Sequence, residues 1–117
     1  MIVQSLLLRI VQHPVLVPSL SKHRRALVCY PNSGEAWDAL RKTWRENTGV
    51  PEPKRFAQTM FAALDAIRTE WKALYPSHLL PRVVLGGCCR TTPKTINALS
   101  EALQRDVQKQ GYTTYGK

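Results

Sequence analysis

The sequence predicts an α/β fold in which short parallel strands alternate with helices. Two runs of apolar residues, 26–30 and 82–86, have the length of strands and are continuous rather than alternating. Such runs are typical of strands that are buried on both faces of a parallel sheet. Between and after them lie two longer stretches with apolar residues at every third or fourth position, which indicates amphipathic helices. This order of elements predicts the α/β class.

The first element we expect is a helix over residues 2–12, which is apolar nearly all round and therefore packed on more than one side. Pro14 and Pro18 end it, and residues 13–25 form an irregular basic connector. The apolar stretch is shorter than the roughly 20 residues that span a bilayer, and it lacks the basic start and cleavage site of a signal peptide. We therefore expect no targeting segment, no membrane partner and a cytoplasmic protein.

The first strand, 26–30, ends at four turn-forming residues, 31–34. Residues 35–44 fit either a helical turn or a structured loop, and 47–53 are a loop. A long helix is predicted over 55–75, ended by the proline that follows. Its apolar stripe consists of Phe56, Met60, Leu64, Ile67, Trp71 and Leu74.

After the second strand, 82–86, a last helix is predicted to begin at Thr92 as N-cap and Pro93 as first helical residue. It ends near Gly111, and residues 112–117 are expected to be a frayed tail. Its apolar stripe consists of Ile96, Leu99, Leu103 and Val107.

Charge and cysteine content narrow the functional classes. Seventeen Lys and Arg against eight Asp and Glu give a net charge of +9. These residues are scattered, apart from the short cluster 22–25, so we expect a solvated basic surface and no nucleic-acid partner. Three cysteines are too few for a disulfide scaffold, and the odd number favours thiols or metal ligands in a reducing compartment.

Cys88 and Cys89 are the main candidates for chemistry. Adjacent side chains on a strand point to opposite faces, so two such cysteines can share a metal only where the backbone turns. They follow Gly86 and Gly87, which permit unusual backbone angles, and precede a helix N-terminus, which favours thiolates. Sulfur ligands select zinc among the common metals. The alternative is a pair of buried small residues without a metal.

Two motifs resemble the homocysteine S-methyltransferase family. Residues 86–93, Gly-Gly-Cys-Cys-Arg-Thr-Thr-Pro, look like its terminal zinc signature. Residues 30–35, Tyr-Pro-Asn-Ser-Gly-Glu, look like its substrate-side loop in the branch that uses S-methylmethionine or S-adenosylmethionine. Trp37-Asp38 and 42–44 also resemble that branch, and the resemblance covers residues 26–103.

The resemblance implies that the two strands are the last two of a (β/α)₈ barrel. It implies a Zn²⁺ cofactor held by three thiolates, two of which are Cys88 and Cys89. The third comes from an Asn-Cys motif on an earlier strand, which this sequence does not contain. The implied substrates are homocysteine and a sulfonium methyl donor, in methionine biosynthesis. Asn32, Ser33 and Glu35 would hold the amino acid's charged groups, with Glu35 facing the ammonium.

We expect the chain to have three parts. Residues 1–25 are an N-terminal helix and basic connector, 26–111 are the C-terminal part of a homocysteine-binding domain, and 112–117 are the tail. A whole barrel of this type needs about 250 residues, so another chain would have to complete the fold. The alternative to an enzyme is a non-catalytic fragment that retains a partial zinc site or acts through a partner chain.

The remaining sulfur and imidazole groups are weaker candidates as ligands. We expect Cys29 to be a buried structural residue rather than the third zinc ligand. The three histidines lie in connecting segments and are expected to be exposed: His13, His23 and His78.

Overall fold

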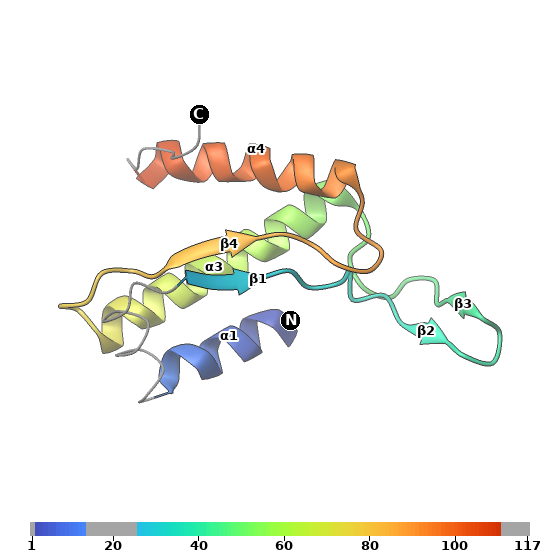
Figure 1. The fold of residues 1–117 in the computed structure, drawn as a ribbon, viewed down its shortest axis with the longest axis horizontal. Helices are drawn as coiled ribbons and strands as arrows, with labels where there is room; N and C mark the ends of the chain where they lie inside the picture. Colours follow the sequence, from blue (N-terminus) through green and yellow to red (C-terminus); the bar gives the residue numbers. More distant parts are fainter. Residues whose placement is uncertain (1, 14–25, 111–117) are drawn as a thin grey trace. The chain divides into compact units, whose positions relative to one another are not determined.

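The computed structural model describes residues 2–13 and 26–110. Figure 1 shows the chain's helices and strands in the predicted order, with an additional hairpin. They are α1 (Ile2–Gln12), β1 (Ala26–Cys29), β2 (Trp37–Asp38), β3 (Thr43–Trp44), α3 (Pro53–Leu74), β4 (Arg82–Leu85) and α4 (Pro93–Gln110). The connector 14–25, with His23, and the predicted tail 112–117 lie outside the described residues. The mixed α/β class is confirmed.

The chain divides into two compact units. The first unit comprises Met1–Cys29 and Thr59–Leu85, and the second comprises Tyr30–Gln58 and Gly86–Lys117. Helix α3 begins in the second unit and ends in the first.

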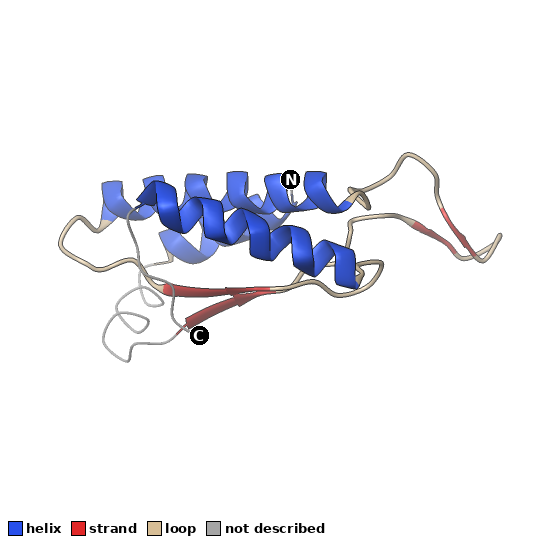
Figure 2. Cartoon of the chain, turned by 90° about the horizontal axis from the view of Figure 1, so that it is seen from above, coloured by secondary structure: helices blue, strands red, loops and turns tan. Residues whose placement is uncertain are grey.

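A parallel strand pair, β1 with β4, forms the sheet of the first unit, and Val28 lies opposite Val84 in its register. Burial alternates along both strands, so the prediction of burial on both faces is wrong. Val28 is 62% exposed and Val84 is 54% exposed. The reason is that the helices of this unit lie on one side of the strands, as Figure 2 shows. Leu27 and Val83, which alternate with the two exposed valines, are half-buried.

The core of the first unit lies between α1 and the C-terminal half of α3. Val11, Ile67 and Trp71 are buried together, and four apolar side chains pack around them: Leu7, Leu8, Tyr75 and Leu80. The Tyr75 hydroxyl donates to the Val11 carbonyl at 3.0 Å, which links the ends of the two helices. Such packing explains why a helix as short as α1 persists, since tertiary contacts supply most helical stability.

Helix α3 begins two residues before the predicted position, because Glu52 caps it. The Glu52 carboxylate accepts hydrogen bonds from the backbone N–H groups of Lys54 and Arg55, at 3.1 and 2.8 Å. Pro53 takes the first helical position, where a missing N–H costs nothing. The predicted stripe is buried except at Leu74.

Helix α4 begins as predicted, with Thr92 as its cap. Thr95 accepts a hydrogen bond from the Thr92 N–H at 3.1 Å, and its own N–H donates to the Thr92 hydroxyl at 3.4 Å. The predicted apolar stripe is partly wrong, because Ile96 is 47% exposed and Leu103 is 44% exposed. The buried face instead carries Thr95, Ala98 and Leu99, one residue around the helix, so small side chains and a threonine make the packing surface.

The segment that fitted either a helical turn or a structured loop is a loop that contains an antiparallel hairpin. Trp37 of β2 lies opposite Trp44 of β3. Their rings meet edge to face with centroids 5.2 Å apart, a favourable aromatic geometry. Asp38 accepts hydrogen bonds from the N–H groups of Leu40 and Arg41 and so turns the chain.

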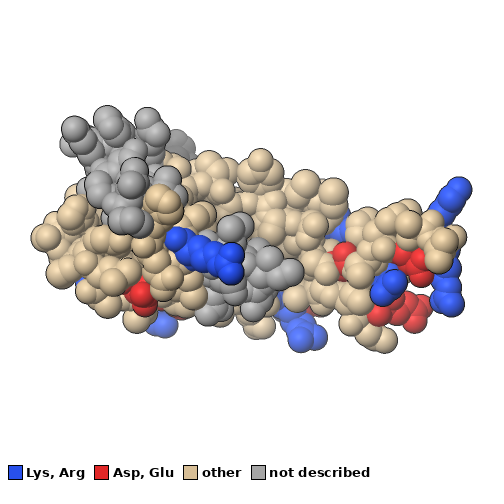
Figure 3. Space-filling model, turned by 90° about the horizontal axis from the view of Figure 1, so that it is seen from below, with Lys and Arg blue, Asp and Glu red and all other residues tan. Residues whose placement is uncertain are grey.

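The surface of the described residues is of mixed charge. On the face that Figure 3 shows, basic side chains occur in separate groups, and those at the hairpin end are interspersed with acidic ones. Among the described residues, no helix combines the length and hydrophobicity that a bilayer crossing requires.

We predict that Trp71→Ala unfolds or strongly destabilises the first unit. Removing this fully buried ring from its contacts with Val11 and Ile67 is expected to cost about 3 to 5 kcal/mol. Leu79→Ala is the control, because that side chain is almost fully exposed. Denaturant unfolding followed by circular dichroism measures both. Similar losses in the two variants would contradict the core assignment.

Candidate functional site

Two segments meet in the second unit: the loop 31–35, which follows β1 in the chain, and the turn 86–92, which follows β4. The Cys88 N–H donates to the Pro31 carbonyl, and the Ser33 N–H donates to the Cys89 carbonyl, both at 3.0 Å. The motifs that the sequence analysis selected are therefore bonded to each other through their backbones. We name them the substrate loop (31–35), after the role that the family resemblance implies, and the cysteine turn (86–92).

The cysteine turn presents two neighbouring thiols. Cys88 and Cys89 are both exposed, and their Sγ atoms are 3.9 Å apart. Thr91 closes the turn, because its N–H and hydroxyl both donate to the Cys88 carbonyl, at 3.2 and 2.6 Å. The alternative of two buried small residues is therefore wrong.

The two glycines before the cysteines do not have a positive φ. The residue of the turn with a positive φ is Arg90, at 64°. Gly87 is needed for another reason: a Cβ there would collide with the side chain of Thr91. At Gly86 a Cβ would make only an ordinary contact with Tyr30.

The spacing of the thiols suits two ligands of one metal ion. Two sulfurs bound at tetrahedral zinc, each about 2.3 Å from the metal, are separated by about 3.8 Å. The observed Sγ–Sγ distance of 3.9 Å is close to that value. Within residues 2–13 and 26–110, no group of three or more His, Cys, Asp or Glu side chains is placed to hold a metal. The described residues therefore offer two neighbouring thiols as candidate ligands.

The other sulfur and imidazole candidates have different surroundings. Cys29 is half-buried at the end of β1, and burial raises the pKa of its thiol, which disfavours the thiolate that metals bind. His13 and His78 are exposed, as expected.

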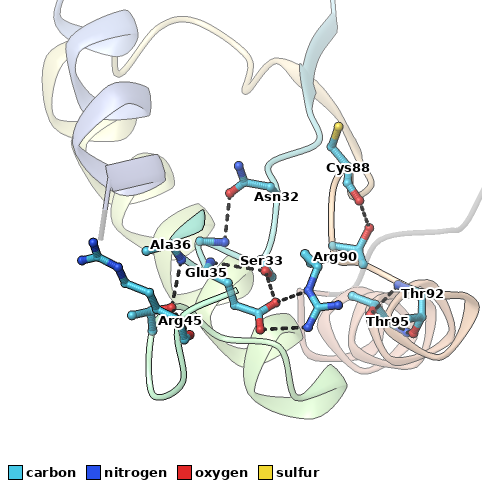
Figure 4. A network of polar contacts seen from close by, with 12 residues as sticks. Asn32, Ser33, Glu35, Ala36, Arg45, Cys88, Arg90, Thr92 and Thr95 are labelled. Atoms are coloured by element: carbon cyan, nitrogen blue, oxygen red, sulfur yellow. Dashed lines mark hydrogen bonds and ion pairs between the residues drawn. The ribbon is translucent and has the colours of Figure 1, made fainter. Parts of the chain in front are cut away.

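The substrate loop is held by its own side chains, as Figure 4 shows. The Asn32 amide oxygen accepts from the Gly34 N–H at 2.9 Å, which is an Asx turn. Ser33 is buried, and its hydroxyl donates to the Glu35 carboxylate at 2.7 Å while accepting from the Glu35 N–H at 3.3 Å. Asn32 therefore shapes the loop, and Ser33 orients Glu35.

A bidentate ion pair joins the substrate loop to the cysteine turn. Arg90 donates from Nε to one Glu35 oxygen at 3.0 Å and from a terminal nitrogen to the other at 3.2 Å (Figure 4). Its guanidinium also lies over the ring of Trp44, 5.3 Å from the centroid. The bonds from Arg90 and then from Ser33 lower the pKa of Glu35, and the Glu35 carboxylate raises the pKa of Arg90. At neutral pH both groups are charged and paired.

Sequence reasoning missed Arg90, although it stands in the quoted motif beside Cys89. The only signal was its position there, because its partner Glu35 is 55 residues away. It also missed Thr48 and Gly49, which contact the backbone of residues 33–36. Thr48 accepts from the Ala36 N–H at 2.9 Å, and the residue after Gly49 donates its N–H to the Ser33 carbonyl at 2.7 Å.

We predict that Gly49→Ala disorders the substrate loop. Gly49 has a φ of 67°, and a Cβ there would collide with the backbone of residues 33–35. Gly34→Ala is the matched control: its φ is 80°, but its Cβ would have ordinary room. The control should lose only the left-handed backbone cost of about 1 kcal/mol, and Gly49→Ala clearly more. Equal losses in denaturant unfolding would contradict the close approach.

We also predict that the contribution of Glu35 to stability depends on pH. Because its pKa is lower in the folded chain, this contribution is present above the unfolded value of about 4.3 and is lost as pH falls through the folded value. The difference in unfolding free energy between the wild type and Glu35→Gln should therefore be larger at pH 7 than at pH 3. A difference that is equal at both pH values would contradict the ion pair.

Comparison with known proteins agrees with the motifs. The family model described as homocysteine S-methyltransferase matches residues 3–103. Homocysteine S-methyltransferase 1 of Arabidopsis thaliana is 40% identical over 84 residues, which are 70% of this chain and 21% of that protein. Homocysteine S-methyltransferase 3 of the same plant is 29% identical over 105 residues, 90% of this chain and 26% of that protein. A selenocysteine methyltransferase of Astragalus bisulcatus is 37% identical over 79 residues, 68% of this chain and 19% of that protein.

The chain spans about a fifth to a quarter of the length of these relatives. No solved structure matches it. The family match nevertheless covers most of the chain, including the substrate loop and the cysteine turn. The chain therefore belongs to the homocysteine S-methyltransferase family.

Proposed function

We propose that this chain carries the zinc-binding and homocysteine-binding edge of a homocysteine S-methyltransferase. The reaction transfers a methyl group from S-methylmethionine or S-adenosylmethionine to homocysteine and gives methionine. The observation that carries the proposal is the cysteine turn, where two exposed thiols 3.9 Å apart lie on a backbone bonded to the substrate loop. Similarity to proteins named as homocysteine S-methyltransferases supports it.

The proposed metal is zinc, held by Cys88 and Cys89 with a third ligand from outside the described residues. The soft thiol pair and its sulfur spacing favour zinc over oxygen-seeking metals. When bound, zinc would supply Lewis acidity that keeps the homocysteine sulfur deprotonated at neutral pH. The role of this chain is to present the two ligands in the geometry that the cysteine turn sets.

The substrate loop is proposed to bind the amino-acid end of homocysteine through Asn32, Ser33 and Glu35. Glu35 would face the ammonium of homocysteine. The Ser33 hydroxyl donates to the Glu35 carboxylate and would hold that carboxylate in place. In the transfer, a bond forms between the homocysteine sulfur and the methyl carbon. The bond from that carbon to the donor's sulfonium sulfur breaks, and its electron pair leaves with the neutral thioether. The donor brings its own leaving group, so the protein mainly positions the reactants.

We further propose that β1 and β4 are the last two strands of a (β/α)₈ barrel. Parallel pairing, helices on one side and an apolar opposite face all suit such a barrel, whose interior is lined by branched side chains. Val28 and Val84 would line that interior. A barrel needs about 250 residues, so further strands, from this protein or another chain, would complete it.

We predict that the chain binds zinc through Cys88 and Cys89. Cys88→Ser and Cys89→Ser should each lower zinc affinity strongly, because a hydroxyl is a poor zinc ligand at neutral pH. Cys29→Ser is the matched control and should retain zinc, since the Cys29 thiol is half-buried and protonated. Competition with a chromogenic chelator measures the affinities. Equal zinc binding by all variants would contradict the proposed site.

Activity requires a separate assay, in which the chain is given zinc, homocysteine and S-methylmethionine and methionine is measured. Selenocysteine is included as a second acceptor, because one relative is named as a selenocysteine methyltransferase. Zinc binding without methyl transfer would favour the second candidate, a non-catalytic member of the family. The observation that favours it is the two-thiol ligand set of the described residues.

A further inference from the structure

The guanidinium of Arg90, in the cysteine turn, is more exposed than the carboxylate with which it pairs. The Arg90 side chain is 45% exposed, whereas that of Glu35 is 9% exposed. A ligand that approaches from solvent therefore meets the positive member of the pair first. One oxygen of Glu35 already accepts two hydrogen bonds, from Ser33 and Arg90.

Arg90 has donors to offer beyond this ion pair. A guanidinium has five N–H donors in a rigid fork, and the bonds to Glu35 use one on Nε and one on a terminal nitrogen. The remaining N–H groups lie in the same plane and match the two oxygens of a carboxylate. A lysine at this position would offer only a point charge.

Three contacts hold the guanidinium in place before any ligand arrives. Glu35 binds it at two points, and the Trp44 ring lies 5.3 Å from its central carbon. In Figure 4 the Arg90 side chain points from the cysteine turn towards Glu35 of the substrate loop. Little conformational entropy is then left to lose on binding, which favours recognition.

We propose that Arg90 binds the α-carboxylate of the amino-acid substrate. This assignment rests on the proposed function. The ammonium and carboxylate of an α-amino acid are attached to one carbon, and the site offers opposite charges in direct contact: Glu35 for the ammonium and Arg90 for the carboxylate. Cys88 and Cys89, the thiols proposed to hold the metal that would take up the substrate sulfur, directly precede Arg90 in the chain.

The experiment measures binding by the zinc-loaded chain, using isothermal titration calorimetry. Three thiols are compared: homocysteine, 3-aminopropane-1-thiol, which lacks the carboxylate, and 4-sulfanylbutanoate, which lacks the ammonium. In the wild type, loss of the carboxylate should weaken binding at least about tenfold, as expected for charge-assisted hydrogen bonds.

Arg90→Gln should remove this discrimination, so that the variant binds homocysteine no more tightly than 3-aminopropane-1-thiol. The affinity for 4-sulfanylbutanoate should fall by the same factor as the affinity for homocysteine. Arg90→Lys keeps the charge and should retain part of the discrimination. Arg41→Gln is the matched control, an exposed arginine of the same unit, and should leave all three affinities unchanged.

The outcomes separate the assignment from the proposed function. If Arg90→Gln weakens homocysteine and 3-aminopropane-1-thiol equally, the residue is merely structural and the inference is wrong, although homocysteine binding stands. If the wild type binds zinc but none of the thiols, the proposed function fails and the role of Arg90 with it.

Discussion

The ion pair between Glu35 and Arg90 joins the two segments that carry the family's motifs, which lie 55 residues apart in the chain. Two backbone hydrogen bonds, from Cys88 to Pro31 and from Ser33 to Cys89, align the segments but do not orient their side chains. The bidentate contact sets where the carboxylate and guanidinium point, and it satisfies a charge that would otherwise be costly at a largely buried position. The substrate loop and the cysteine turn therefore act as one structural element.

The supports of this element are made of small and constrained residues. Gly49 allows the backbone of its own loop to lie directly against that of residues 33–35, and Gly87 leaves room for the Thr91 side chain. Thr92 and Thr95 begin α4 immediately after the turn. Substitutions are thus least tolerated at these small residues, where the backbone or a neighbouring side chain leaves no room. The two thiols, by contrast, are exposed.

The sequence predicted the helices, both parallel strands, the N-cap at Thr92 and the place of the two cysteines in the turn after the second strand, because each depends on local patterns of a few residues. It failed where distant contacts decide. The start of α3 depends on Glu52, which caps the helix. The buried face of α4 depends on which residues of the fold pack against Thr95 and Ala98. The partner of Arg90 could not be read from sequence spacing, since an ion pair across 55 residues leaves no local period.

The valine pair on β1 and β4 has a consequence for the protein's behaviour in solution. Val28 and Val84 form a bare apolar strip on a two-stranded sheet, a kind of sheet that is marginally stable by itself. Open strand edges beside such a strip are templates for pairing with other chains. Unless further strands cover it, the chain would self-associate as its concentration rises. The exposed sheet, and not oxidation of the thiols, would then limit the concentration at which the chain stays monomeric.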